Sequence, residues 1–310
     1  MRLLRIIPDD THIRFMWLRR VMLPLSMATV VLSLALFFTV GLNLGIDFRG
    51  GTLIEIQTEG PADIGELRSQ IGELELGDVQ IQEFGAPNDV LIRIAQQEGG
   101  DAAQQVAISQ VRDLLGDAVD YRRVETVGPT ISAELARAGT IAVIVAIFAI
   151  MIYIWFRFEW QFAIGAVIAL VHDVVLTIGV FSLFQLDFAL ASIAAILTIV
   201  GYSLNDTVVV YDRVRENLRR YKKMPIIELL DVSINQMLPR TVMTSLTTLL
   251  ALGALYVFGG EVIRTFVFAM IWGVIVGTYS SVYIAAPVLL YLGLQRGAPA
   301  AGQEATQPAE

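Results

Sequence analysis

Six long apolar runs dominate this sequence and restrict its fold more than any other feature. A helix of about 20 apolar residues crosses the roughly 30 Å hydrocarbon core of a bilayer. The runs cover residues 21–41, 136–156, 161–183, 188–211, 240–259 and 264–292. With 55% hydrophobic and 17% charged residues, the chain is predicted to be a polytopic α-helical membrane protein with six transmembrane helices. The first run is too long for the core of a signal peptide, so we expect it to remain as an anchor.

Basic residues collect on one side of the membrane if the six runs alternate in direction. These residues are Arg2, Arg5, Arg14, Arg19, Arg20, Arg157, Arg213, Arg215, Arg219, Arg220, Lys222, Lys223, Arg240 and Arg296. Because Lys and Arg accumulate on the cytoplasmic side, both termini are predicted to be cytoplasmic. We expect a cytoplasmic N-terminus over 1–20, a basic cytoplasmic loop or surface helix over 212–239, and a disordered tail over 293–310.

The segment 42–135 then lies outside the membrane, and its pattern changes to short amphipathic elements. Strand patterns alternate with two helical patterns, at 51–58, 61–74, 78–84, 89–95, 101–115 and 118–127. The order β-α-β-β-α-β predicts a small α+β, ferredoxin-like periplasmic domain. Seventeen Asp and Glu residues against six Arg are scattered along this segment. They favour a solvated acidic surface, and the alternative is a contact surface for polypeptides or partner proteins.

Several kinds of chemistry are excluded or disfavoured by composition. The chain has no cysteine, which excludes disulfides and thiolate ligands, and two histidines are too few for a histidine metal cluster. No P-loop motif occurs. We therefore expect no metal, cofactor, enzymatic activity or nucleic-acid partner. Any work that the chain performs must draw on a partner or an ion gradient.

Four ionisable residues are placed where a membrane helix rarely carries them. Asp206 lies in the fourth run, His172 and Asp173 lie in the third, and Arg240 follows Pro239 at the predicted start of the fifth. A charged side chain at mid-membrane costs about 2.5–3.5 kcal/mol on insertion scales, so it must face the protein interior, water or a counter-charge. A carboxyl group held between burial and an arginine can exchange a proton near neutral pH, as a proton relay requires.

Smaller polar residues accompany these four groups. Ser203 and Asn205 shortly precede Asp206 on the fourth run. Thr244 and Thr248 follow Arg240 at intervals of four, which places them on one helical face. We predict that these side chains line the relay.

Each of these groups also has a purely structural interpretation. Asp206 can hold neighbouring helices together by hydrogen bonds, and the pair His172–Asp173 can be an ordinary contact between helices. Arg240 can be one more basic residue at the cytoplasmic interface.

Two glycine motifs predict backbone geometry. The sequence "DFRGG" joins the first run to the outer segment, where its glycines permit a sharp turn or hinge. In the last run, small residues recur every four positions and predict close helix packing. The hinge motif is Asp47, Phe48, Arg49, Gly50 and Gly51, and the packing row is Gly273, Gly277 and Ser281.

These motifs together resemble the SecF-type subunits of the SecD/SecF family, within the resistance–nodulation–division superfamily of transporters. The match rests on "DFRGG" (47–51), "VGPTIS" (127–132), "HD" (172–173), "GYSLNDTVVVYDRVREN" (201–217), "PRT" (239–241), "FGG" (258–260) and "GTYSS" (277–281). They are spread over most of the chain, and the motif at 201–217 is long and specific.

The resemblance implies a complex with SecD, association with the SecYEG channel and YajC, and a place in the bacterial inner membrane. It implies use of the proton-motive force to help preproteins cross that membrane, with Asp206 as the proton-relay carboxylate and Arg240 as the functional arginine. H⁺ is the expected coupling ion, and the sequence leaves Na⁺ open. The alternatives are a small-molecule or lipid exporter, which predicts larger outer domains and two six-helix halves in one chain, and a scaffold that transduces nothing.

Overall fold

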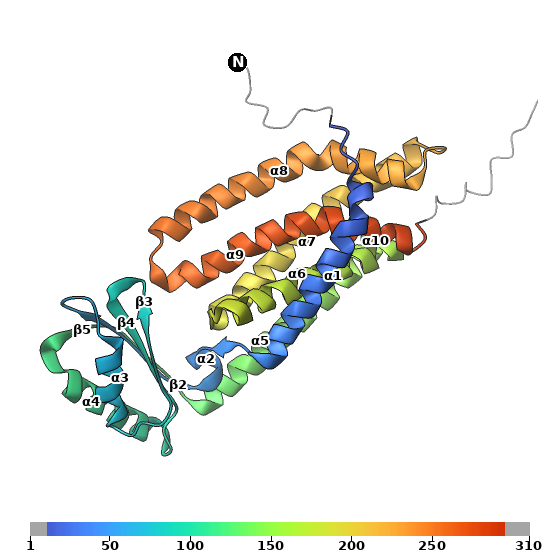
Figure 1. Cartoon of the computed structure of the whole chain (residues 1–310). Coiled ribbons are helices and arrows are strands. Elements are labelled where there is room, and N and C mark those ends of the chain that lie inside the picture. The colour runs from blue at the N-terminus through green and yellow to red at the C-terminus, as the bar shows by residue number, and fades with distance from the viewer. Residues whose placement is uncertain (1–10, 295–310) are drawn as a thin grey trace, which may run out of the picture.

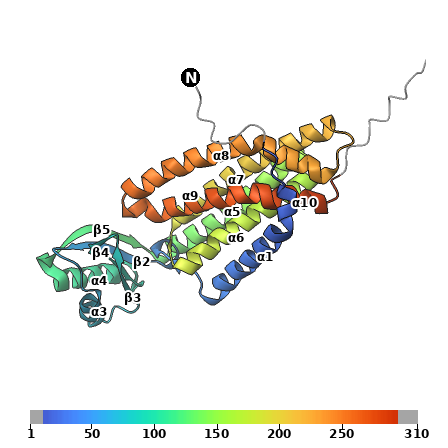
Figure 2. The same cartoon turned by 45° about the horizontal axis from the view of Figure 1, so that its top comes forward.

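The computed structural model describes residues 11–294 and consists of a helical bundle with a small α+β domain at one end (Figures 1 and 2). The connection between α7 and α8 lies at the opposite end of the bundle. The first ten residues of the predicted cytoplasmic N-terminus lie outside the described residues. So does nearly all of the predicted tail, from residue 295 onward.

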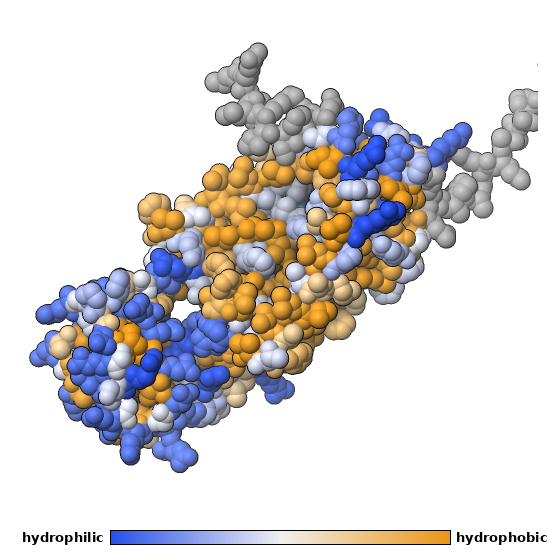
Figure 3. Space-filling view, in the orientation of Figure 1, coloured by the Kyte–Doolittle hydropathy of each residue, from blue (hydrophilic) through white to orange (hydrophobic). Residues whose placement is uncertain are grey.

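Within residues 11–294, six helical segments are long and apolar enough to cross a membrane, as predicted. Their outer side chains are apolar, with Phe38, Phe156 and Phe258 exposed by 79%, 89% and 86%. Figure 3 shows this apolar surface over the bundle and a hydrophilic surface over the outer domain. The segments are α1 (Phe15–Thr39), α5 (Pro129–Arg157), α6 (Trp160–Phe184), α7 (Leu190–Arg220), α8 (Ile226–Phe258) and a last segment comprising α9 (Glu261–Ser280), the π-helical turn η2 (Ser281–Ala285) and α10 (Ala286–Tyr291).

The segment 212–239, for which we expect a loop or a surface helix, is mostly helical. The helix α7 continues to Arg220, and α8 already begins at Ile226, so that Pro239 lies inside a helix instead of starting one. Pro239 has no N–H for the carbonyl of Asn235 four residues earlier. That carbonyl accepts a hydrogen bond of 3.5 Å from the Thr11 hydroxyl instead.

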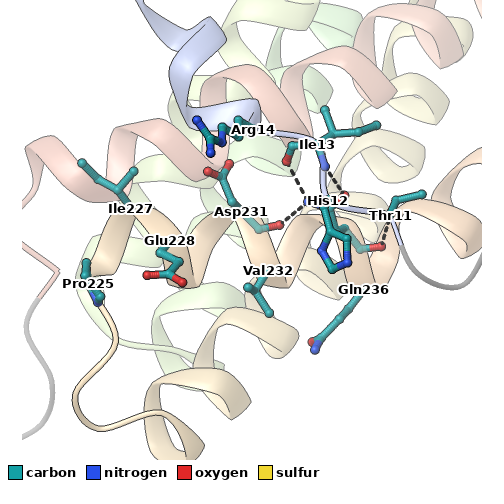
Figure 4. Close-up of a pocket in the computed structure, with 11 residues that line it drawn as sticks. Thr11, His12, Ile13, Arg14, Pro225, Ile227, Glu228, Asp231, Val232 and Gln236 are labelled. Atoms are coloured by element: carbon teal, nitrogen blue, oxygen red, sulfur yellow. Dashed lines mark hydrogen bonds between the residues drawn. The ribbon is translucent and has the colours of Figure 1, made fainter.

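The start of α1 is fixed by side chains of α8 (Figure 4). Asp231 accepts a hydrogen bond from the Met16 amide at 2.8 Å. It therefore caps the first turn of α1, although it is far from that helix in the sequence. The Asn235 amide side chain accepts from the Ile13 N–H at 2.9 Å and donates to the Ile13 carbonyl at 2.8 Å. These contacts attach the segment before α1 to the N-terminal half of α8.

The outer domain has the predicted order of strands and helices. Its elements are β2 (Gly51–Thr58), α3 (Ile64–Gly72), β3 (Val79–Phe84), β4 (Ala86–Ile94), α4 (Gly100–Leu115), the short η1 (Gly116–Ala118) and β5 (Val119–Val127). The sheet order is β3-β4-β2-β5 with all neighbours antiparallel, as in a split β-α-β fold. Asp63 caps α3 by accepting from the Glu66 amide. Ile54, Ile92 and Val111 lie in the core between the sheet and its two helices.

A short connector joins this domain to the bundle. It contains β1 (Asn43–Leu44), which pairs in parallel with β6 (Asp187–Phe188) between α6 and α7, and the one-turn helix α2 (Ile46–Arg49). Gly50 and Gly51 follow with φ of +73° and +108°, a region that favours glycine. A side chain at Gly51 would collide with the Ile94 carbonyl of β4.

Candidate functional site

Asp206 lies inside the bundle, where α7 meets α8 and the π-helical turn. Its side chain is enclosed, and the residue is 8% exposed. The Thr241 hydroxyl of α8 donates to Oδ1 at 2.8 Å, and the Ser281 hydroxyl of η2 donates to Oδ2 at 2.6 Å. Both donors are neutral hydroxyls. They stabilise the ionised carboxylate by hydrogen bonds, but they carry no positive charge that would neutralise it.

Close packing between α7 and α9 makes this arrangement possible. Gly273 lies against the Ile199 side chain of α7, and a Cβ on Gly277 would stand 2.9 Å from that of Ser203. Small residues at intervals of four let two membrane helices approach closely. The helices therefore bring Ser281 within hydrogen-bonding distance of Asp206.

Replacing Gly273 with alanine should destabilise this contact, because the new methyl group collides with Ile199. We expect a loss of about 1–3 kcal/mol in the free energy of unfolding, measured by denaturant unfolding of the purified protein in detergent. Gly253→Ala is the matched control, because its Cβ would meet nothing within 4 Å. Equal stability of the two variants would contradict the packing role of Gly273.

Asp173 occupies a second enclosed site on α6 and is fully buried. It accepts hydrogen bonds from Ser203 of α7 at 2.5 Å and from Ser280 of α9 at 2.7 Å. The His172 Nδ1 lies 2.9 Å from its other carboxylate oxygen. The His172 ring stacks on Tyr279 with centroids 6.1 Å apart.

The predicted relay residues therefore do not form a single cluster. Asp206 and Asp173 are enclosed, whereas the others named below are exposed or bonded to their own helix. Arg240 is exposed, and no ion pair within 4.0 Å joins it to Asp206 in the described part of the chain. Thr244 and Thr248 donate to carbonyl groups of their own helix instead of to Asp206. Asn205 is exposed on α7.

Two contacts of the carboxylates were not predicted from the sequence. Thr241 directly contacts Asp206, whereas the sequence predicts that Thr244 and Thr248 line the relay. The sequence predicts Ser281 as part of a helix-packing row, but its hydroxyl, at the start of the π-helical turn, donates to Asp206. The available signal was the "GTYSS" motif, where two adjacent serines follow the glycine of that row.

A third polar cluster lies where the outer domain meets the bundle. Arg93 of β4 forms an ion pair of 2.7 Å with Asp187 of β6 and donates to the Asn43 side chain at 3.2 Å. Nearby, the Asp47 carboxylate accepts from the Leu190 amide at 2.8 Å, at the first residue of α7. Burial raises the pKa of Asp187 above its ordinary value, and Arg93 opposes that effect.

Residues 11–294 contain no group of three or more His, Asp or Glu side chains placed to hold a metal ion. The bundle instead encloses two carboxylates, Asp173 and Asp206. The fold and these groups together define a polytopic helical membrane protein with candidate ion-exchange groups. In such proteins, buried ionisable residues commonly mark ion pathways or proton relays.

Comparisons with known proteins agree with this architecture. The family described as "Protein export membrane protein SecD/SecF, C-terminal" matches residues 107–295, and the "SecD/SecF GG Motif" matches residues 35–62. The chain is 47% identical to protein translocase subunit SecF of Cereibacter sphaeroides over 305 residues, which cover 96% of this chain and 94% of that protein. This chain therefore belongs to the SecD/SecF family of protein-export membrane proteins.

Longer relatives contain the same unit as part of one polypeptide. Protein translocase subunit SecDF of Brucella abortus is 48% identical over 295 residues, covering 95% of this chain and 39% of that protein. The crystal structure of SecDF from Thermus thermophilus, described as a translocon-associated membrane protein, matches with a TM-score of 0.85 and 35% identity. The match covers 94% of this chain and 40% of that one, so this chain spans about two fifths of the SecDF relatives.

Proposed function

We propose that this chain is the SecF-type subunit of a complex that uses the proton-motive force to promote Sec-dependent translocation of preproteins across the bacterial inner membrane. The observation that carries the proposal is the enclosed carboxyl group of Asp206, which is hydrogen-bonded by hydroxyls of two other membrane segments. The chain belongs to a family named for protein export, and we therefore propose that the cargo is a protein.

Proton exchange at Asp206 can convert the ion gradient into movement. The ionised carboxylate costs about 2.5–3.5 kcal/mol at mid-membrane, and protonation removes that charge. A proton that crosses the field releases roughly 2.3 kcal/mol per 100 mV. Loss of the charge weakens the hydrogen bonds from Thr241 and Ser281, so the contacts of α7 with α8 and η2 change. Arg240 favours the ionised form through space, and Asp173 with His172 forms a second candidate exchange site.

The connector supplies a path from Asp206 to the outer domain. Asp206 and Leu190 lie on the same continuous helix, α7. Asp47 binds the Leu190 amide, and β1 pairs with β6 immediately before α7. A tilt of α7 therefore moves the connector and the periplasmic domain, which in turn assists the emerging preprotein.

The partners follow from the family and from an exposed polar residue of the spans. Asn205 on α7 is exposed within a membrane-spanning helix, where a polar side chain requires a polar surrounding. A SecD subunit supplies that surrounding, in keeping with relatives named SecDF. We also propose association with SecYEG and YajC, and an orientation with both termini in the cytoplasm.

Inverted membrane vesicles with and without the complex provide the test, because their difference in preprotein translocation isolates its contribution. We expect a protonophore to remove this difference even with ATP present, because no other energy source is proposed for the complex. Replacing Na⁺ with K⁺ should leave the difference unchanged. A dependence on Na⁺ would reassign the coupling ion, and a difference that persists without any gradient would show that the chain is a scaffold.

A further inference from the structure

The two buried carboxylates are held by consecutive residues of the last membrane segment. Ser280 donates to Asp173 Oδ2 at 2.7 Å, and Ser281 donates to Asp206 Oδ2 at 2.6 Å. The first carboxylate belongs to α6 and the second to α7. The donors to the Asp173 site and the Asp206 site are therefore neighbouring residues, joined by a single peptide bond.

The backbone changes its geometry at this position. The α-helical segment ends at Ser280, and the π-helical turn runs from Ser281 to Ala285. Pro287 follows and cannot donate to the Tyr283 carbonyl within the turn, which accounts for the local widening. The Ala285 carbonyl accepts from the Tyr211 hydroxyl at 3.0 Å. Such π-helical turns often occur at functional sites.

Each serine hydroxyl has a second acceptor within reach. Ser280 Oγ lies 3.2 Å from the Gly277 carbonyl oxygen, and Ser281 Oγ lies 3.0 Å from that of Thr278. A hydroxyl carries one hydrogen, so the carboxylate and the helix carbonyl compete for it. When the carboxyl group is protonated it becomes a donor, and the serine can accept from it while donating to the carbonyl.

We propose that Ser280 and Ser281 are positioning residues that hold Asp173 and Asp206 in both protonation states by rotation of their hydroxyls. In the ionised state each serine donates to its carboxylate, and in the protonated state it donates to its own helix. At the serine itself, this exchange requires only rotation of the hydroxyl about its own side chain. This inference rests on the proposed function, because it assumes that the carboxyl groups change protonation during export.

Other ionisable groups on α7 and on the elements packed against it must be considered in any pH experiment. They are His172 and Asp173 of α6, Glu228, Asp231, Arg240 and Tyr256 of α8, Glu261, Arg264 and Tyr279 of α9, Tyr283 of η2, Glu134, Arg137, Tyr153 and Arg157 of α5, Asp187 of β6, and Tyr202, Tyr211, Asp212, Arg213, Arg215, Glu216, Arg219 and Arg220 of α7. Ser281→Ala leaves all of these groups in place. A change in the pH profile of this variant therefore reports the lost hydroxyl.

The test measures preprotein translocation by inverted vesicles while the pH on the cytoplasmic face is varied. In Ser281→Ala the ionised carboxylate loses a charge-assisted hydrogen bond and the protonated carboxyl group loses a weaker neutral one, so proton release requires a more alkaline solution. We expect the profile to move by about one pH unit to higher pH, with a severalfold loss at neutral pH. Ser281→Thr keeps the hydroxyl and should retain the original profile, and Ser280→Ala tests the donor to Asp173 in the same way.

Ser182→Ala is the matched control, since this buried hydroxyl binds only the carbonyls of Leu36 and Gly41 among the described residues. It should not move the profile. A uniform loss at every pH in Ser281→Ala would reduce the serine to a packing role and overturn the inference. If Asp206→Asn abolishes export while Ser281→Ala keeps the original profile, only the inference fails. If Asp206→Asn exports normally, the proposed function fails.

Discussion

Asp206→Asn should abolish the export stimulated by the complex while the chain still assembles in the membrane. Asparagine has nearly the same size as aspartate, and its carbonyl oxygen can accept a hydrogen bond from one of the two hydroxyls of Thr241 and Ser281 while its NH₂ group donates to the other. It cannot exchange a proton, so no energy can be drawn from the field, which supplies roughly 2.3 kcal/mol per proton for each 100 mV. Preprotein translocation by vesicles should therefore fall to the level of vesicles that lack the complex.

Asp212→Asn provides the comparison for this result. Asp212 lies on the same helix, but its side chain is 60% exposed and faces Arg157 at 3.5 Å. An exposed pair of this kind contributes only about 0–1 kcal/mol, so export should be unchanged. The amount of each variant in the membrane and its co-purification with SecD must equal those of the original chain. Normal export by Asp206→Asn under these conditions would show that this carboxyl group takes no part in ion coupling.

Much of the fold could be predicted because it depends on local periodicity. The long apolar runs define six spans, and the order of short elements between 51 and 127 defines the outer domain. The ends of the helices were predicted less accurately, because α7 and α8 continue as polar helices beyond their apolar runs. Pro239 was predicted to begin a helix, but Thr11 satisfies the carbonyl that it leaves free. Thr11 is distant in sequence, so no local signal indicates this contact.

The candidate site was predictable only in part for the same reason. A carboxyl group in an apolar run identifies Asp206 and Asp173 without any structure, because each is costly in lipid. Their hydrogen-bond donors depend on how helices far apart in the sequence are rotated against one another. Ser281 illustrates this, because its spacing from Gly273 and Gly277 predicts packing, whereas its contact with Asp206 depends on how the last segment is rotated against α7. The ion pair between Arg93 and Asp187 likewise could not be predicted, because it depends on how the outer domain is placed against the bundle.

Arg93→Ala should loosen the outer domain from the bundle and reduce export severalfold. The Arg93 and Asp187 side chains are 9% and 31% exposed, so the pair is largely enclosed. Removing one partner of a fully buried pair costs about 3–5 kcal/mol. Partial exposure reduces this to about 2 kcal/mol here, or roughly a thirtyfold change in the ratio of docked to undocked domain. Export should fall because the domain no longer follows α7.

Pairs of spin labels can measure this docking, because the chain has no cysteine and introduced cysteines are labelled selectively. Val106 on α4 and Val262 on α9 are exposed and suitable sites. Arg93→Ala should broaden the distance distribution, and Arg93→Ala with Asp187→Asn should narrow it again, because no uncompensated charge remains. An unchanged distribution in Arg93→Ala would show that the ion pair does not hold the domain.

The pH dependence of the same distance gives an independent measure of the ion pair. Burial raises the pKa of Asp187 in the docked state, and Arg93 is the main opposing influence. Without Arg93 that pKa rises further, so the docked state binds a proton more tightly than the undocked state. Docking of Arg93→Ala should therefore recover as the pH falls through the docked-state pKa and be lost again as the pH rises. Asp187→Asn removes the carboxyl group, and the variant that carries both substitutions should show no such dependence.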